Sequence, residues 1–159
     1  EAFAEQASLS GVDGLITVNL PPEEAGPLAM ALQEKEIDPI YLLAPTTTDA
    51  RAVAVCQASR GFVYYVSLKG TTGSGSLDIK AVCERVAHLK AKTPLPLFVG
   101  FGIKDGETAA PIAEVADGVV VGSAIVTLMG EFEASPQALK LAVIELVRDI
   151  RTALNASNP

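Results

Sequence analysis

Residues 95–103, LPLFVGFGI, join a short apolar run to a glycine-containing loop, and residues 118–125, GVVVGSAI, repeat that arrangement. Three similar apolar runs come earlier in the chain, at residues 14–18, 39–43 and 62–66. Each run is short, β-branched or aromatic, and apolar at successive positions, which is typical of a parallel strand covered on both faces. No two-residue hairpin turn separates the runs. We therefore predict five parallel strands.

Helical patterns fill the segments between these runs. Pro22 is expected to open one helix, because proline suits the first turn and the carboxylates that follow it favour the helix dipole. Threonines at residues 46–48 are N-cap candidates for the next helix. Two further helices are expected over residues 77–89 and from Pro136 onward, each with an apolar stripe at helical spacing.

Strands that alternate with helices define an α/β fold with right-handed crossovers. No linker or low-complexity stretch divides residues 1–159, so we expect a single domain. Two architectures share this alternation: a complete five-stranded doubly wound sheet, and part of a (β/α)₈ barrel, which needs about 250 residues. The periodicity alone does not choose between them. The chain starts at Glu1, as though within a helix, and we expect it to be part of a longer protein.

Composition excludes several classes of function. Of the 159 residues, 49% are apolar and 19% charged, which excludes a disordered chain. The net charge of −7 argues against nucleic-acid binding, and no apolar stretch is long enough to span a bilayer. Two cysteines without CxxC spacing, Cys56 and Cys83, indicate buried thiols in a reducing compartment. We expect a cytoplasmic protein that contacts neither nucleic acid nor membrane.

The loops after the fourth and fifth runs are the first candidates for a binding site, since functional loops follow the carboxyl ends of parallel strands. In residues 100–103 and 122–125, small residues let backbone N–H groups approach an anion, and a helix start adds positive partial charge. Either loop alone could be a plain tight turn. As a pair on consecutive strands, they favour a phosphate site made of backbone amides.

The loop after the third run, residues 67–76, is dense in Gly, Ser and Thr. Such a loop over the mouth of a site is typical of a lid that closes on substrate, and the alternative is a flexible connector. It is not a P-loop, because no Gly-Lys-Ser/Thr follows at the required spacing.

Groups able to move protons are scarce near this mouth. Asp13 and Asp117 precede strands, on the opposite face, and Asn19 ends the first strand with an amide. Tyr64 and Tyr65 are the titratable groups on a strand near the mouth, and alternation points one inward and one toward the helices. No general base is visible in the sequence. The lone histidine, His88, is expected on the surface, and we predict no metal site.

Three segments together carry a specific resemblance. Residues 64–73 (YYVSLKGTTG), 100–103 (GFGI) and 122–126 (GSAIV) resemble the alpha subunit of tryptophan synthase, and residues 11–14 and 20–24 fit as well. The resemblance runs along the whole chain and covers the last five strands of the family's barrel. It implies a partial (β/α)₈ barrel, also called a TIM barrel.

The family cleaves indole-3-glycerol phosphate reversibly to indole and glyceraldehyde 3-phosphate, a lyase step of tryptophan biosynthesis. The resemblance implies no cofactor in this chain, with pyridoxal phosphate on a beta-subunit partner. The phosphate would be held by Gly73, Gly102, Gly122 and Ser123. The indole pocket would be lined by Val18, Phe101 and Val120. The lid threonine would be Thr72, the tyrosine near the reacting carbons would be Tyr64, and the beta subunit would face Asn19, Leu20 and Pro21.

This sequence also departs from the family's pattern. The family's two catalytic carboxylates belong to segments that precede these residues, so we predict that this chain alone is inactive. Asn19 stands where the family has aspartate, and Thr71 stands where valine is usual in the lid. An alternative function is a half-barrel that binds a phosphorylated ligand or a partner without turnover, and that associates with itself through exposed strand edges.

Overall fold

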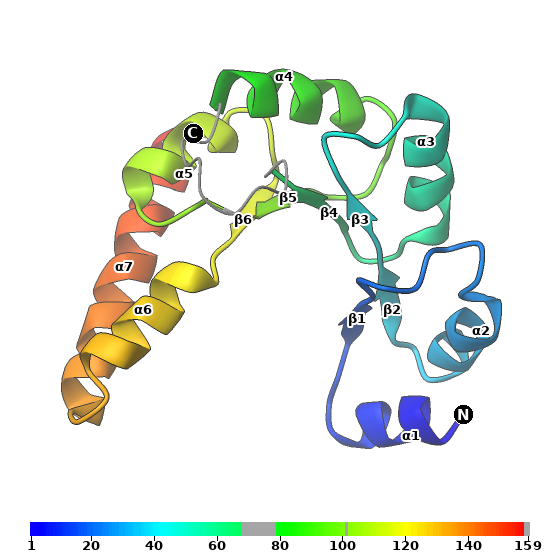
Figure 1. Ribbon diagram of the computed structural model, residues 1–159, viewed down its shortest axis with the longest axis horizontal. Helices are drawn as coiled ribbons and strands as arrows, with labels where there is room; N and C mark the ends of the chain where they lie inside the picture. Colours follow the sequence, from blue (N-terminus) through cyan, green and yellow to red (C-terminus); the bar gives the residue numbers. More distant parts are fainter. Residues whose placement is uncertain (68–78, 101, 158–159) are drawn as a thin grey trace.

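A computed structural model describes residues 1–67, 79–100 and 102–157. Helices and strands alternate from α1 (Ala2–Leu9) to α7 (Pro136–Ser157), as Figure 1 shows. Between them lie β1 (Gly14–Ile16), α2 (Gly26–Glu34), β2 (Asp38–Ile40), β3 (Leu42–Leu43), α3 (Asp49–Ala58), β4 (Val63–Val66), α4 (Ile79–Lys90), β5 (Leu97–Gly100), α5 (Gly106–Ala113), β6 (Gly118–Val120) and α6 (Ser123–Glu131).

The order of the strands separates the two architectures that the sequence left open. Every strand pair is parallel, and the sheet orders are β1-β2 and β3-β4-β5-β6. A doubly wound sheet reverses direction at a switch point, so its strand order is permuted. Strands that pair in chain order are typical of a (β/α)₈ barrel segment. The predicted α/β barrel-type fold is confirmed.

The predicted strand over residues 39–43 is wrong in one respect, because it is broken at Tyr41. Before the break, β2 pairs with β1; after it, β3 pairs with β4. The carbonyl of Tyr41 accepts a hydrogen bond from the amide of Tyr64 at 3.2 Å, and its side chain is 3% exposed. The break lets one run of chain change its pairing partner where the row of strands bends.

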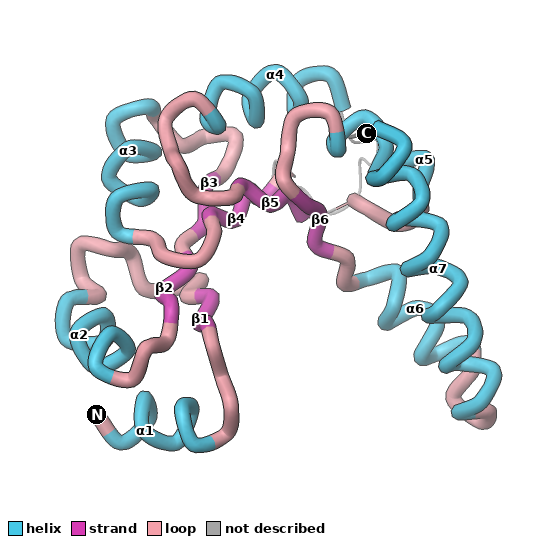
Figure 2. Tube along the Cα trace, turned by 180° about the vertical axis from the view of Figure 1, so that it is seen from behind, coloured by secondary structure: helices cyan, strands magenta, loops and turns pink. Residues whose placement is uncertain are grey.

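Helices cover one side of this row of strands, and the strands form the inner arc (Figures 1 and 2). The side chains that face the helices are fully buried: Leu43, Val63, Tyr65, Leu97 and Val99. The alternate residues Tyr64, Val66 and Phe98 are half-buried. Among the described residues, helices therefore cover one face of the strands, and the expectation that both faces are covered stays a prediction.

Two predicted helix starts are confirmed, and the one predicted for α2 is wrong. Thr48 caps α3 by accepting a hydrogen bond from the amide of Arg51 at 3.4 Å, and α7 begins at Pro136, both as predicted. The helix expected from Pro22 begins instead at Gly26, with Pro27 in its first turn. Residues 21–25 form a turn, because the carbonyls of Pro21 and Pro22 accept bonds from amides three residues on.

The cysteines behave as expected. Cys56 is buried and belongs to the main core, and Cys83 is half-buried with its thiol 3.3 Å from the carbonyl of Pro111. Burial raises the pKa of both thiols, so they stay protonated at neutral pH. Across the described residues, no helix is long and apolar enough to cross a membrane.

Candidate functional site

The carboxyl ends of β5 and β6 lie side by side. Gly100 is in register with Val120, so the chain leaves both strands at the same edge of the sheet. Gly102 and Gly122 each follow two residues later, which brings the two glycine loops together as the sequence predicted. Val120 is half-buried and shares the uncovered face with Gly100.

The loop after β5 has a defined backbone. Gly102 has a φ of 79°, a left-handed conformation that favours glycine. Ile103, at 2% exposure, anchors the loop in the core. A reciprocal pair of bonds between Asp105 and Thr108 then caps α5. The loop is therefore held in place on the carboxyl side of Gly102, which itself is exposed.

The loop after β6 ends in a helix start that no side chain caps. Gly122 is the N-cap of α6, and its carbonyl accepts bonds from Ile125 and Val126 at 3.0 and 3.1 Å. Gly122 and Ser123 are both exposed. The amides of a first helical turn have no partner within the helix, so this terminus can receive an anion.

Tyr64 lies on the uncovered face and packs over Gly100. A Cβ atom on Gly100 would lie 2.1 Å from the Tyr64 hydroxyl oxygen, so only glycine fits beneath this ring. Burial raises the pKa of Tyr64, and the phenol therefore stays protonated at neutral pH. It can donate a hydrogen bond to a ligand but does not serve as a base. Tyr65 points to the helices, as alternation predicted.

Ser67 joins the end of β4 to the end of β5, a role that sequence reasoning missed. Its hydroxyl donates to the carbonyl of Gly100 at 2.8 Å, and its amide donates to the same oxygen at 3.0 Å. The side chain is buried. A serine directly after an apolar run, at the mouth side, is the only signal the sequence carries for this contact.

The loop after β1 is separate from these contacts. Val18 is 72% exposed and Asn19 is exposed, so no described side chain encloses the position expected to line an indole pocket. Leu20 is half-buried and packs against the main core, and Pro21 is half-buried. Further along the loop, Glu23 pairs with Arg51 of α3 at 2.9 Å.

Three carboxyl groups with a shifted pKa, at the two ends of the strands, are in the wrong state for acid catalysis. Asp117 precedes β6 as predicted, where its carboxylate pairs with Lys90 and accepts the Leu97 amide at 2.7 Å. Burial by itself raises the pKa of Asp117, but these bonds outweigh it and the pKa falls. Hydrogen bonds also lower the pKa of Asp49 and Asp105. A general acid needs a raised value.

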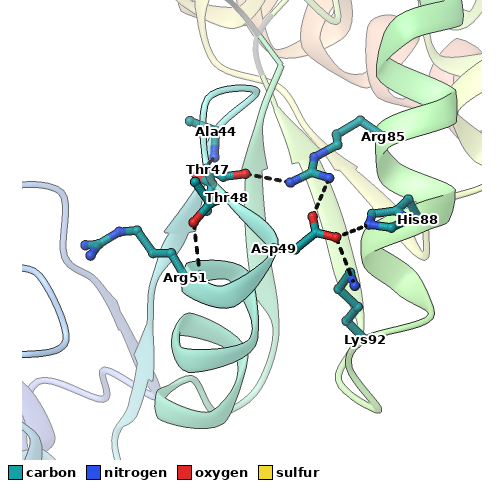
Figure 3. Close-up of polar contacts among 8 residues, drawn as sticks. All are labelled: Ala44, Thr47, Thr48, Asp49, Arg51, Arg85, His88 and Lys92. Carbon is teal, nitrogen blue, oxygen red and sulfur yellow. Dashed lines mark hydrogen bonds and ion pairs between the residues drawn. The ribbon is translucent and has the colours of Figure 1, made fainter.

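A cluster of charged groups on α3 and α4 was also missed (Figure 3). Asp49 accepts from Arg85 at 2.8 Å, from His88 at 2.7 Å and from Lys92 at 3.2 Å. Arg85 donates in addition to the carbonyl of Thr47 at 2.6 Å. His88 is half exposed, as expected, and the residues around it line an open cavity of about 360 Å³. The cluster holds α4 against the start of α3. No spacing of residues in the sequence predicts this cluster.

Three predicted site residues, Thr72, Gly73 and Phe101, lie outside the described residues, as does nearly all of the proposed lid. Among the residues that the structure does describe, no group of three potential ligands could hold a metal ion.

Parallel strands paired in chain order, with glycine loops at their carboxyl ends, place this chain in the (β/α)₈-barrel class of folds. The family model for the tryptophan synthase alpha chain matches residues 1–155. The chain belongs to the tryptophan synthase alpha chain family, as the three sequence segments indicated.

Two relatives show how much of the family's full length this chain covers. The chain is 52% identical to the tryptophan synthase alpha chain of Thioalkalivibrio sulfidiphilus, over 98% of this chain and 58% of that protein. It superimposes on subunit alpha from Legionella pneumophila with a TM-score of 0.82 and 39% identity, over 98% of this chain and 56% of the other. The chain thus spans under two thirds of the length of these relatives and corresponds to their carboxyl-terminal portion.

Proposed function

We propose that this chain supplies the phosphate-binding part of a lyase that cleaves indole-3-glycerol phosphate reversibly to indole and glyceraldehyde 3-phosphate. The observation that carries the proposal is the paired loops at the ends of β5 and β6, together with the uncapped start of α6. Backbone amides at Gly102, Gly122 and Ser123 would hold the phosphate without a lysine. Gly73 would add a further amide.

The uncovered face beside these loops would receive the indole ring. Val120 and the half-buried Tyr64 lie on that face, and Phe101 and Val18 would complete the pocket. Tyr64 would donate a hydrogen bond near the reacting carbons, and Thr72 would close over the ligand. We propose that the proton transfers belong to carboxylates outside these residues, so that the chain alone binds but does not turn over.

The partner would be a tryptophan synthase beta subunit in the cytoplasm. The relative from Pyrococcus furiosus, 34% identical with a TM-score of 0.80, is described in an α2β2 complex. Exposed Asn19, with Leu20 and Pro21, would face the partner here. Pyridoxal phosphate would be bound by that subunit, with no cofactor in this chain, whose residues 1–159 we propose form one domain.

A second candidate function is a half-barrel that binds a phosphorylated ligand or a partner without catalysis. It is favoured by the lowered pKa of the carboxyl groups near the carboxyl ends of the strands, Asp49 and Asp105. The two candidates share the phosphate site and differ in whether turnover returns when the remaining barrel segments are supplied.

The binding test uses glycerol 3-phosphate and two variants at one position. Ser123→Pro removes one amide donor but suits the first position of a helix. Ser123→Ala keeps the amide and removes only the hydroxyl. Titration followed by amide NMR shifts should place the ligand at Gly102, Gly122 and Ser123. We expect Ser123→Pro to weaken binding by about tenfold or more, as for a lost bond to a charged group, and Ser123→Ala to weaken it less.

Ligand shifts confined to other loops, or equal binding by both variants and the parent chain, would contradict the phosphate site. Indole release is then measured with the 159-residue chain alone and after addition of the amino-terminal part of a relative. We expect no release from the chain alone. Release only in the mixture supports the lyase, and binding without release in either sample supports the non-catalytic module.

A further inference from the structure

The starts of α5 and α6 differ in how their backbone amides are satisfied. In α5, the Thr108 hydroxyl oxygen accepts hydrogen bonds from the amides of Lys104 and Asp105 at 3.0 and 3.2 Å. Next along the chain, the amide of Gly106 donates to a carboxylate oxygen of Asp149 at 2.7 Å. Three successive amides therefore already have side-chain partners, whereas among the described residues no side chain caps α6. Both helices follow strands that end at the same edge of the sheet.

Asp149 reaches the start of α5 from the last helix of the chain. It lies 43 positions after Gly106, on α7, which packs beside α5 and α6 (Figures 1 and 2). Gly106 is buried, and a Cβ atom on it would lie 3.0 Å from the carbonyl oxygen and from both carboxylate oxygens of Asp149. Glycine at this position therefore lets α7 approach closely enough for the carboxylate to reach the amide. The next residue, Ile150, is 5% exposed and anchors this part of α7 in the main core.

The contact between Asp149 and Gly106 bears on the loop after β5. Three residues separate Gly106 from Gly102, and the first of them, Ile103, is buried in the main core. The chain is therefore fixed at two points directly after Gly102. A backbone segment that is already ordered loses less conformational freedom when a ligand binds to it. A carboxylate at the start of a helix also offsets the positive partial charge there, which makes the start of α5 less attractive to an anion than the start of α6.

We propose that Asp149 is a positioning residue for the phosphate site: by accepting the Gly106 amide, it holds the loop of Gly102 in its binding conformation. This inference rests on the proposed function, because it takes the loops after β5 and β6 to be the phosphate site. Asp149 acts without contact to the ligand. Its negative charge at the start of α5 directs the phosphate toward the amides of Gly122 and Ser123. The last helix thereby contributes to ligand affinity without lining the site.

Glycerol 3-phosphate titration of the 159-residue chain, followed by amide NMR shifts, compares substitutions on α7. Asp149→Ala removes the carboxylate and should raise the dissociation constant about threefold to tenfold, because the loop must then be ordered on binding. Asp149→Asn keeps an acceptor oxygen on a side chain of similar size and should bind more tightly than Asp149→Ala. The matched control is Glu145→Ala, which removes the same charge one turn earlier on α7. Glu145 is exposed and, among the described residues, forms no ion pair, so this control should bind like the parent chain.

Two further readouts separate positioning from a general loss of stability. Without ligand, the Gly106 amide should exchange its hydrogen faster in Asp149→Ala than in the parent chain, while exchange in β4 and β5 stays unchanged. With ligand, the Gly106 amide should shift more in Asp149→Ala than in the parent chain, because a freed amide at a helix start attracts phosphate. Circular dichroism establishes that each variant is folded. Gly106→Ala crowds the same contact from the α5 side and should also weaken binding, so the test does not depend on one variant.

Equal affinities of Asp149→Ala, Glu145→Ala and the parent chain would overturn the positioning role and leave the phosphate site intact. The positioning role would also be overturned if the Gly106 amide of Asp149→Ala exchanged at the parent rate. A parent chain that does not bind glycerol 3-phosphate at the two glycine loops would contradict the proposed function, and this inference with it. The two failures are distinguishable, because the second is already seen in the parent chain and the first appears only when the variants are compared with it.

Discussion

The two faces of strands β3–β6 differ in how deeply their side chains are buried. On the helix side, Leu43, Val63 and Val99 are 0% exposed. On the other side, their neighbours Leu42, Tyr64 and Val66 are half-buried. Both sets are apolar, so polarity does not distinguish them. The difference predicts that the helix-facing set contributes more to the stability of the fold than the uncovered set does.

Two adjacent leucines give the largest expected contrast. Leu43→Ala leaves a cavity in the helix-covered core and should lower the free energy of unfolding by about 2–5 kcal/mol. Leu42→Ala, on the uncovered face, should cost less than half as much, since part of that side chain is already in contact with water. Urea denaturation followed by circular dichroism measures both. Equal losses would show that the two faces contribute alike.

Two glycines test the uncovered face itself. Gly100→Ala places a methyl group 2.1 Å from the Tyr64 hydroxyl, and overpacking of this kind should cost about 1–3 kcal/mol of unfolding free energy. Gly118→Ala comes only to 3.1 Å from the edge of the Phe98 ring and should cost less. Denaturation and glycerol 3-phosphate titration should both separate these variants. If Gly100→Ala is as stable and as tightly binding as Gly118→Ala, Tyr64 is not held by this contact.

Substitution of two buried serines tests the carboxyl ends of the strands against their amino ends. Ser67→Ala removes a 2.8 Å bond to the Gly100 carbonyl, and Ser59→Ala removes a 2.8 Å bond to the Val55 carbonyl. Each loss should lower the unfolding free energy by about 1 kcal/mol. Only Ser67→Ala should also weaken glycerol 3-phosphate binding, because the Ser67 hydroxyl connects the end of β4 to the loop-bearing end of β5. Loss of binding in both variants would contradict this local role.

The charged cluster in the helix layer gives the smallest effect, and it depends on pH. Bonds from Arg85, His88 and Lys92 hold the pKa of Asp49 far below its ordinary 3.8. The resulting stability is present above the unfolded-state pKa and is lost as the pH falls through the folded-state value. The stability difference between the parent and Asp49→Asn should therefore be constant near neutral pH and shrink below about pH 4. A difference that stays constant to pH 2 would contradict the cluster's contribution.

Local signals predicted much of the helix and strand pattern. Alternation placed Tyr64 and Tyr65 on opposite faces, and Thr48 and Pro136 marked the starts of α3 and α7. These features depend on contacts a few residues apart, which the chain specifies by itself. Pro22 failed as a helix start because residues 21–25 close a turn first, and a second proline, Pro27, follows inside α2.

Long-range contacts in the candidate site gave no such signal. The bond from Ser67 to Gly100 joins residues 33 positions apart, and those around Asp49 join residues 36 to 43 apart. No periodicity links such residues, since their meeting depends on how β4 and α4 are placed beside their neighbours. The glycine loops were found because each follows its own strand directly, and the sheet register then placed them together.

The amino-acid sequence by itself determined the α/β alternation, the family and the glycine loops, because each depends on the order and spacing of residues that are neighbours in the chain. The tertiary structure alone decided the chain-order pairing of the strands, the break at Tyr41, the uncovered face beneath Tyr64 and the partners of Asp49. These depend on which elements come together and which side of the strands the helices occupy. Packing between residues far apart in the sequence decides both, and no local sequence pattern predicts such packing.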